Sequence, residues 1–289
     1  MIKKGIILAG GKGTRMSPLT KAVNKQLLPI YDKPLIFYPL SILMLANIKD
    51  VLIIVNKGEL EQYKKIIPNG KNLGIKITYA EQKSPRGLPE AFIIGQKFIG
   101  KDSVALILGD NFFYGQNLTK KLQDCSNLNK GAKILLHKVA KPELYGVAKI
   151  NKSNKIISIR EKPKKFFSDL AITGLYFFDN KVIKFAKKLN PSKRGEIEIV
   201  DLLNLYKNKN ELSAELIGRG GAWLDTGSIE DFYKTSAFVA AIENRQGLKI
   251  ACLEEIAFMK KWIGKKQIAN AIKFYGNCDY SIYLKKIAH

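Results

Sequence analysis

The residues best suited to chemistry lie near the N-terminus, in a loop with three glycines in four positions. Residues 10–13 read Gly-Gly-Lys-Gly, and Thr14 and Arg15 follow. Without Cβ atoms, consecutive backbone N–H groups can approach an anion closely. Thr14 adds a hydroxyl donor, and Arg15 adds a planar cation that suits phosphate oxygens. The loop therefore predicts a binding site for the phosphates of a nucleoside triphosphate.

Two common glycine-rich phosphate motifs do not fit this loop. The dinucleotide-binding fingerprint needs a third glycine where Met16 stands. The P-loop needs Ser or Thr directly after Gly-Lys, and none of the four Gly-Lys pairs in the chain has it. An ordinary strand-to-helix turn is the remaining alternative, although an Arg and a Thr inside a tight turn have no packing role.

Two acidic and two basic residues further along could act on the same phosphates. Asp110 follows the continuous apolar run at residues 104–108, and Asp225 stands in a glycine-rich stretch. Lys25 lies just after the glycine loop, and Lys162 lies in a Glu-Lys-Pro turn. Two carboxylates with several cations suit phosphoryl or nucleotidyl transfer assisted by Mg²⁺. Alternatively, Asp110 and Asp225 could be ordinary turn residues, and Lys162 could be a solvated surface lysine.

Composition excludes several other kinds of site. The two histidines, His137 and His289, have no partner pattern, which disfavours zinc sites and histidine-based triads. The three cysteines are scattered, which fits a reducing cytoplasm rather than a disulfide framework. The net charge of +24 is spread along the chain without a basic run, so we expect an anionic small substrate and no nucleic-acid partner. The longest apolar stretch, residues 34–48, is too short for a membrane span.

The hydrophobic pattern predicts an α/β fold with a mostly parallel mixed sheet flanked by helices. Strands are expected at residues 5–9, 51–55, 75–80, 104–108, 134–136, 147–150, 155–160, 171–178 and 212–217. Helices are expected at residues 35–46, 59–67, 89–98, 180–189, 198–206 and 229–243. We interpret residues 218–227 as a glycine-rich loop and everything from residue 247 onward as a small helical segment.

Ordered motifs over nearly the whole chain resemble the sugar-nucleotide pyrophosphorylases, and closely the glucose-1-phosphate thymidylyltransferases. They lie at residues 7–15, 24–34, 108–111, 145–147, 161–163, 173–176, 222–227 and 243–249. The resemblance implies a Rossmann-like nucleotidyltransferase fold and Mg²⁺-dependent formation of dTDP-glucose and diphosphate from dTTP and glucose 1-phosphate. It also implies a cytoplasmic homotetramer, with a core at residues 1–243 and a C-terminal helical segment for oligomerisation or regulation at residues 244–289.

The resemblance also implies a role for individual residues. The catalytic residues would be Arg15, Lys25, Asp110 and Lys162, and the metal ligands would be Asp110 and Asp225. Gln26 and Gln82 would contact the base edge, and Lys162 would hold the sugar phosphate. Substrate-binding residues would be Leu8, Gly10, Gly11, Gly13, Thr14, Gln26, Gln82, Pro85, Gly87, Asn111, Tyr145, Gly146, Glu161, Ile172, Thr173, Gly174 and Trp223.

Three alternatives stay open at this point. In residues 84–91, relatives more often have an acidic residue at position 86 and Ala-Gln at 89–90, so a related enzyme that uses UTP, CTP or ATP is one alternative. A glycosyltransferase is the second, but that class needs an Asp-x-Asp motif, and Asp110 is followed by Asn111 and Phe112. The third is a non-catalytic relative, which would usually lack Arg15 or a metal aspartate.

Met259 stands where a basic residue is common in the regulatory nucleotide site of relatives. Feedback inhibition at that site is therefore not expected from the resemblance.

Overall fold

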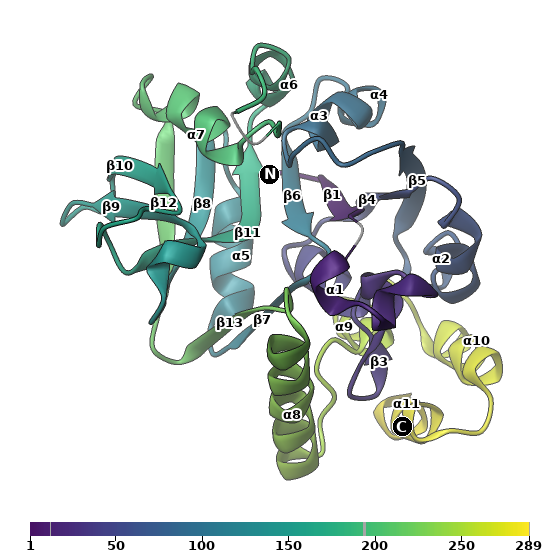
Figure 1. Ribbon diagram of the computed structural model, residues 1–289. Coiled ribbons are helices and arrows are strands. Elements are labelled where there is room, and N and C mark those ends of the chain that lie inside the picture. The colour runs from purple at the N-terminus through teal and green to yellow at the C-terminus, as the bar shows by residue number, and fades with distance from the viewer. Residues whose placement is uncertain (12, 193–194, 289) are drawn as a thin grey trace.

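The computed structural model describes residues 1–11, 13–192 and 195–288, and its centre is a mixed β-sheet (Figure 1). Four parallel strands form one half, in the order β5 (Lys76–Gln82), β4 (Asp50–Asn56), β1 (Lys4–Ala9) and β6 (Val104–Leu108). The antiparallel strand β11 (Leu170–Phe178) joins β6 to the second half. That half contains β8 (Ala132–Lys138), β9 (Gly146–Ile150), β10 (Ile156–Glu161) and β12 (Leu212–Ile217). The predicted mixed α/β fold is confirmed.

The central strands are apolar throughout because both faces of the sheet are covered. Successive residues point to opposite faces, so Ile6 and Ile7 of β1 enter two different hydrophobic cores. The core around Ile7 includes residues of α1 (Phe37–Leu45), α5 (Leu118–Ser126) and α9 (Leu253–Met259). The core around Ile6 includes residues of α3 (Glu90–Ile94), α6 (Lys181–Ala186) and α7 (Ile199–Lys207). A three-layer arrangement results, with the loops after the parallel strands gathered at one edge.

Two predicted elements differ in detail from the structure. The expected helix at 89–98 is split into α3 and α4 (Gln96–Ile99) at Gly95, where an added Cβ would lie 2.9 Å from Ile6 of the sheet. The expected loop at 218–227 contains a strand, β13 (Gly221–Asp225), so that prediction is wrong for these five residues. Strand β13 pairs antiparallel with β7 (Asn111–Gly115), which comes from far earlier in the chain. Because the pairing partner is far away in the chain, the residues around β13 give little indication of a strand.

The C-terminal part of the chain begins with the long helix α8 (Ile229–Gln246) and continues into α9, α10 (Lys265–Tyr275) and α11 (Asp279–Ala288). The Ser228 side chain accepts a hydrogen bond from the Asp231 N–H at the start of α8, and Gly247 ends the helix with a left-handed φ of 68°. Helix α8 is continuous across residue 243, and the division expected there stays a prediction. None of the described helices combines the length and hydrophobicity that a bilayer crossing requires.

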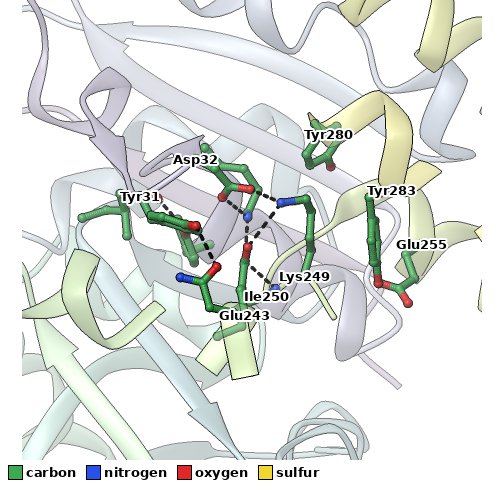
Figure 2. A network of polar contacts seen from close by, with 12 residues as sticks. Tyr31, Asp32, Glu243, Lys249, Ile250, Glu255, Tyr280 and Tyr283 are labelled. Atoms are coloured by element: carbon green, nitrogen blue, oxygen red, sulfur yellow. Dashed lines mark hydrogen bonds and ion pairs between the residues drawn. The ribbon is translucent and has the colours of Figure 1, made fainter. Parts of the chain in front are cut away.

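A polar network joins this C-terminal region to the hairpin of β2 (Pro29–Ile30) and β3 (Lys33–Pro34). Figure 2 shows Asp32, Glu243, Lys249 and Ile250 converging. The Glu243 carboxylate accepts hydrogen bonds from the Lys33 ammonium and from the Ile250 N–H, each at 2.8 Å. Asp32 pairs with both Lys33 and Lys249. The network therefore fastens three separate stretches of the chain together.

Candidate active site

The glycine loop leaves β1 at the edge where the parallel strands end. Gly11 and Gly13 have left-handed φ values of 109° and 57°, which glycine adopts without a steric cost. Asn56, at the end of the neighbouring strand β4, accepts from the Gly11 N–H at 2.9 Å and donates to the Gly11 carbonyl at 3.0 Å. The Thr20 hydroxyl donates to the Gly13 carbonyl at 2.8 Å. Lys12, part of the predicted motif, lies outside the described residues.

Asp110 and Lys25 form an ion pair at the carboxyl end of β6. The Lys25 Nζ lies 2.5 Å from Asp110 Oδ2, and the lysine side chain is largely buried. Thr226 fixes the backbone of Asp110, because its N–H and its hydroxyl both donate to the main-chain carbonyl of Asp110, at 3.1 and 2.8 Å. The structure thus brings together two of the residues predicted to act on phosphates.

The second acidic residue, Asp225, lies at the end of β13 opposite Asn111 in the strand register. A Cβ added to Gly227 would lie 2.9 Å from a terminal nitrogen of Arg15 and 3.2 Å from both carboxylate oxygens of Asp225. Arg15 and Asp225 therefore meet over Gly227. The charges of Arg15, Lys25 and Asp110 all act on the Asp225 carboxylate. These four residues, from separate stretches of the chain, therefore form one cluster just after the glycine loop.

The pKa values of Asp110 and Asp225 are shifted in opposite directions. Burial and the nearby charge of Asp110 raise the pKa of Asp225 to about 6, although Lys25 and Arg15 oppose the shift. Burial would also raise the pKa of Asp110, but the Lys25 ammonium and hydrogen bonds from Lys25 and Asn111 outweigh it, so its pKa lies below the ordinary value. Two like charges held close in a buried setting are suited to sharing a divalent cation.

The donor set fits Mg²⁺ better than a transition metal. Within residues 1–11, 13–192 and 195–288, no three His, Cys, Asp or Glu side chains are grouped closely enough for an all-protein metal cage. Magnesium characteristically takes one or two carboxylates and completes its octahedral shell with water and substrate phosphate oxygens. Asp110 and Asp225 beside the glycine loop, which is predicted to bind phosphates, match that requirement.

Asn111 connects the acidic end of the site to a neighbouring pair of aromatic side chains, Trp223 and Tyr145. Its Oδ1 accepts hydrogen bonds from the Trp223 indole N–H at 2.6 Å and from the Gly174 N–H at 2.9 Å. Its amide nitrogen donates to Asp110 Oδ1 at 3.0 Å. The Trp223 ring packs edge-on against Tyr145, with centroids 5.1 Å apart. Gly174 is required at this point, because an added Cβ would lie 2.6 Å from Asn111 Oδ1.

The remaining residues predicted for the sugar side lie on β9, β10 and β11. Gly146 pairs with Glu161, and a Cβ on Gly146 would lie 2.9 Å from Glu161 Oε2. The Lys162 N–H donates to the Tyr145 carbonyl at 3.0 Å, while its side chain is exposed. Ile172 and Thr173 are buried, and the Thr173 hydroxyl donates to the Leu135 carbonyl at 3.1 Å. The Thr173 hydroxyl proton is therefore already engaged within the sheet.

On the other side of the glycine loop lie the residues predicted to contact the base. Gln82 ends β5, and its Oε1 would be 2.5 Å from a Cβ on Gly10. Gln26 packs beside Gly109, and its Oε1 is a buried acceptor with no hydrogen-bond partner among the described residues. Gly87 has a left-handed φ of 109° in the loop before α3. Pro85 and Thr14 are exposed, and Leu8 is half-buried in β1.

Sequence reasoning missed three residues that support this arrangement. Asn56 follows a buried strand and holds the glycine loop, and its position at a strand end is a signal that could have been used. Thr226 holds the Asp110 backbone, and Glu90 accepts a hydrogen bond from Gln82. The contacts of these last two depend on tertiary structure, so the local sequence gave no indication of them.

The fold and the site define a class of protein. The family model for nucleotidyl transferases matches residues 4–242, and the chain belongs to that family.

Individual proteins are also similar to this chain over most of its length. A glucose-1-phosphate thymidylyltransferase of Neisseria meningitidis is 48% identical over 284 residues, covering 98% of this chain and 99% of the relative. A Bacillus anthracis protein assigned to the same activity, solved in complex with sucrose, superposes with a TM-score of 0.75 at 38% identity, over 81% of this chain and 94% of that one. A UDP-glucose pyrophosphorylase complexed with UDP-glucose gives a TM-score of 0.74 at 26% identity, over 85% of this chain and all of that one.

Proposed function

We propose that the chain catalyses the reaction of dTTP with α-D-glucose 1-phosphate to give dTDP-glucose and diphosphate, a step of nucleotide-sugar biosynthesis. The observation that carries this proposal is the convergence of Asp110, Asp225, Lys25 and Arg15 at one end of the glycine loop. The names of the full-length relatives supply the substrates.

The chemistry needs no protein nucleophile and no proton transfer. A phosphate oxygen of glucose 1-phosphate attacks the α-phosphorus of dTTP, a new P–O bond forms, and the bond to diphosphate breaks. Because both reactants are polyanions, Arg15, Lys25 and Lys162 offset their repulsion and stabilise the charge on the oxygens of the transition state. Asp110 and Asp225 would hold Mg²⁺, which would supply further charge neutralisation at the phosphates when bound.

The other site residues position the substrates. The backbone of the glycine loop, with Gly10, Gly11, Gly13 and Thr14, holds the triphosphate. Gln26 and Gln82 contact the base edge. The sugar lies against Tyr145 and Trp223, and its phosphate contacts Lys162. Holding both reactants in line supplies much of the remaining rate enhancement.

The C-terminal segment has a separate role in the proposal. Residues 244–289 form an oligomerisation or regulatory extension of a cytoplasmic homotetramer. Support comes from exposed apolar side chains in this region, Leu248, Met259, Phe274 and Ile282, which a second subunit could cover. Size-exclusion chromatography with light scattering should give the mass of four chains. The mass of a single chain would contradict the proposed tetramer.

The reaction is tested by measuring diphosphate release from the purified protein. We expect release with dTTP, glucose 1-phosphate and Mg²⁺, loss of release when EDTA removes the metal, and recovery when Mg²⁺ is restored. Omitting the sugar phosphate is the control. If dTTP and every other nucleoside triphosphate fail to support diphosphate release, the proposed reaction is wrong.

A second candidate substrate is UTP. The likeness to a UDP-glucose pyrophosphorylase favours it, and uracil presents the same hydrogen-bonding edge as thymine. Comparing kcat/KM for dTTP and UTP in the same assay separates the two. If UTP is preferred, the proposed nucleotidyl transfer stands, but the nucleotide substrate is UTP instead of dTTP.

A further inference from the structure

Gln82 is held by a carboxylate that no part of the proposed mechanism uses. Its amide nitrogen donates to Glu90 Oε2 at 2.6 Å, and both side chains are buried. The other carboxylate oxygen, Oε1, accepts from Arg86 Nε at 2.7 Å and from a terminal nitrogen of Arg86 at 2.6 Å. The Arg86 N–H also donates to Glu90 Oε2, at 3.2 Å. Glu90 is thus fixed from two directions while it contacts Gln82.

This contact decides which way the Gln82 amide faces. An ionised carboxylate accepts hydrogen bonds and cannot donate them, so only the amide NH₂ group can point at Glu90. The carbonyl oxygen Oε1 must then point the opposite way. It faces the glycine loop, where a Cβ on Gly10 would be only 2.5 Å from it. Glu90 therefore fixes an acceptor, rather than a donor, on the wall of the nucleotide site.

An acceptor at this position distinguishes the bases by their hydrogen-bonding edges. Thymine and uracil carry an N–H at N3, which can donate to Gln82 Oε1. Cytosine has a lone pair at N3 and adenine has one at N1, so both would place an acceptor against an acceptor. A buried polar group left unpaired in this way is costly, which is why sites built on such hydrogen bonds discriminate strongly.

We infer that Glu90 is a positioning residue for base selection: by holding the Gln82 amide with its oxygen toward the base, it admits a base with an N3–H and rejects cytosine. Arg86 supports this by neutralising and tethering the Glu90 carboxylate. The inference rests on the proposed function, since it assigns the base specificity of that same site.

The decisive variant is Glu90→Gln, assayed for kcat/KM with dTTP and dCTP. A glutamine at position 90 can donate as well as accept, so the Gln82 amide is free to rotate and present its NH₂ group to cytosine N3. We expect the ratio of kcat/KM for dTTP over dCTP to fall by about tenfold or more. Glu81→Gln makes the same chemical change on an exposed neighbouring side chain and should leave the ratio unchanged. Arg86→Ala keeps the carboxylate but removes its tether, so the ratio should fall less than in Glu90→Gln.

A second measurement needs no variant. dTTP methylated at N3 lacks the N–H that Gln82 Oε1 is expected to accept, so the unaltered enzyme should use it at least about 100-fold less well than dTTP. The inference is overturned if N3-methyl-dTTP is used as well as dTTP, or if active Glu90→Gln retains the original ratio. Both of these results presuppose that the unaltered enzyme releases diphosphate with dTTP. Failure of that release instead overturns the proposed function.

Discussion

The Lys33 ammonium lies 2.8 Å from Glu243 Oε1, and only 1% and 4% of these two side chains are exposed. Lysine and glutamate are rarely buried so completely unless they are paired. The pair joins the β2–β3 hairpin, just downstream of Lys25, to the last turn of α8, just before the C-terminal helices. An ion pair in this position holds the C-terminal segment against the part of the chain that carries the active site.

Removing one partner of this pair should therefore be costly. Glu243→Ala leaves the Lys33 charge buried with Asp32 as its remaining partner and also removes the acceptor of the Ile250 N–H. We expect the free energy of unfolding to fall by about 3 kcal/mol, measured by urea denaturation. Glu230→Ala, which removes an exposed i,i+4 pair with Lys234, should leave it essentially unchanged.

The reverse test replaces the pair rather than breaking it. Lys33→Met combined with Glu243→Leu buries no unpaired charge at these two positions, and Asp32 keeps Lys249 as a partner. The double variant should recover most of the stability that Glu243→Ala loses. Equal losses in the single and double variants would show that shape, rather than charge pairing, holds the segment.

The sequence predicted those parts of the fold that have a local signal. Buried strands such as β4 and β6 read as unbroken apolar runs, and the glycine loop follows directly from one of them. Helix α5 was missed, although Leu118, Leu122 and Cys125 have helical spacing and are buried. Strand β13 could not be found, because it is completed only by pairing with β7.

The same limit applies to the site. Asp110, Lys25 and Arg15 were predicted from their residue types and their positions after strands or glycines. The buried state of Lys33 could not be predicted, because Asp32-Lys33 reads as an exposed charged pair until Glu243, 210 residues later, is brought beside it. Glu90 likewise gains its contact with Gln82 only when β5 and α3 pack together.

We expect the charged Asp225 side chain to lower the stability of the protein, although the proposed reaction needs it. Its pKa is about 6 in the folded protein and 3.8 in an ordinary aspartate, so the folded state binds more protons between these values. Stability should therefore fall as pH rises from about 4 to 6 and stay reduced above pH 6. Asp225→Asn should raise the free energy of unfolding at pH 8 in EDTA by about 1–3 kcal/mol, and by less at pH 5.

The same variant should lose diphosphate release, because it removes one of the two proposed Mg²⁺ ligands. Denaturation curves at the two pH values and the activity assay measure both effects on one preparation. Asp124→Asn, on an exposed face of α5, is the control and should change neither quantity. An Asp225→Asn protein that is no more stable at pH 8 than at pH 5, relative to the unaltered chain, would contradict the assigned repulsion.

Asn111 should support both the proposed sugar-binding side of the site and the fold. Asn111→Ala removes the acceptor shared by the Trp223 indole and the Gly174 N–H, and each buried donor left unpaired costs about 1–3 kcal/mol. We expect lower stability in urea, and a KM for glucose 1-phosphate that rises more than the KM for dTTP. The exposed Asn127→Ala is the matched control. Unchanged stability would mean that water replaces the amide fully.

Lys162 gives the most direct test of the electrostatic mechanism. Its side chain is exposed and makes no hydrogen bond or ion pair with any other described residue, so removing it should not affect folding. Lys162→Ala should nevertheless lower kcat/KM for diphosphate release by about 100-fold, as expected for loss of one cation that contacts the reacting phosphates. Lys164→Ala removes an exposed lysine two residues away and should have little effect. Equal kinetics in the two variants would remove Lys162 from the mechanism and leave charge neutralisation to Arg15 and Lys25.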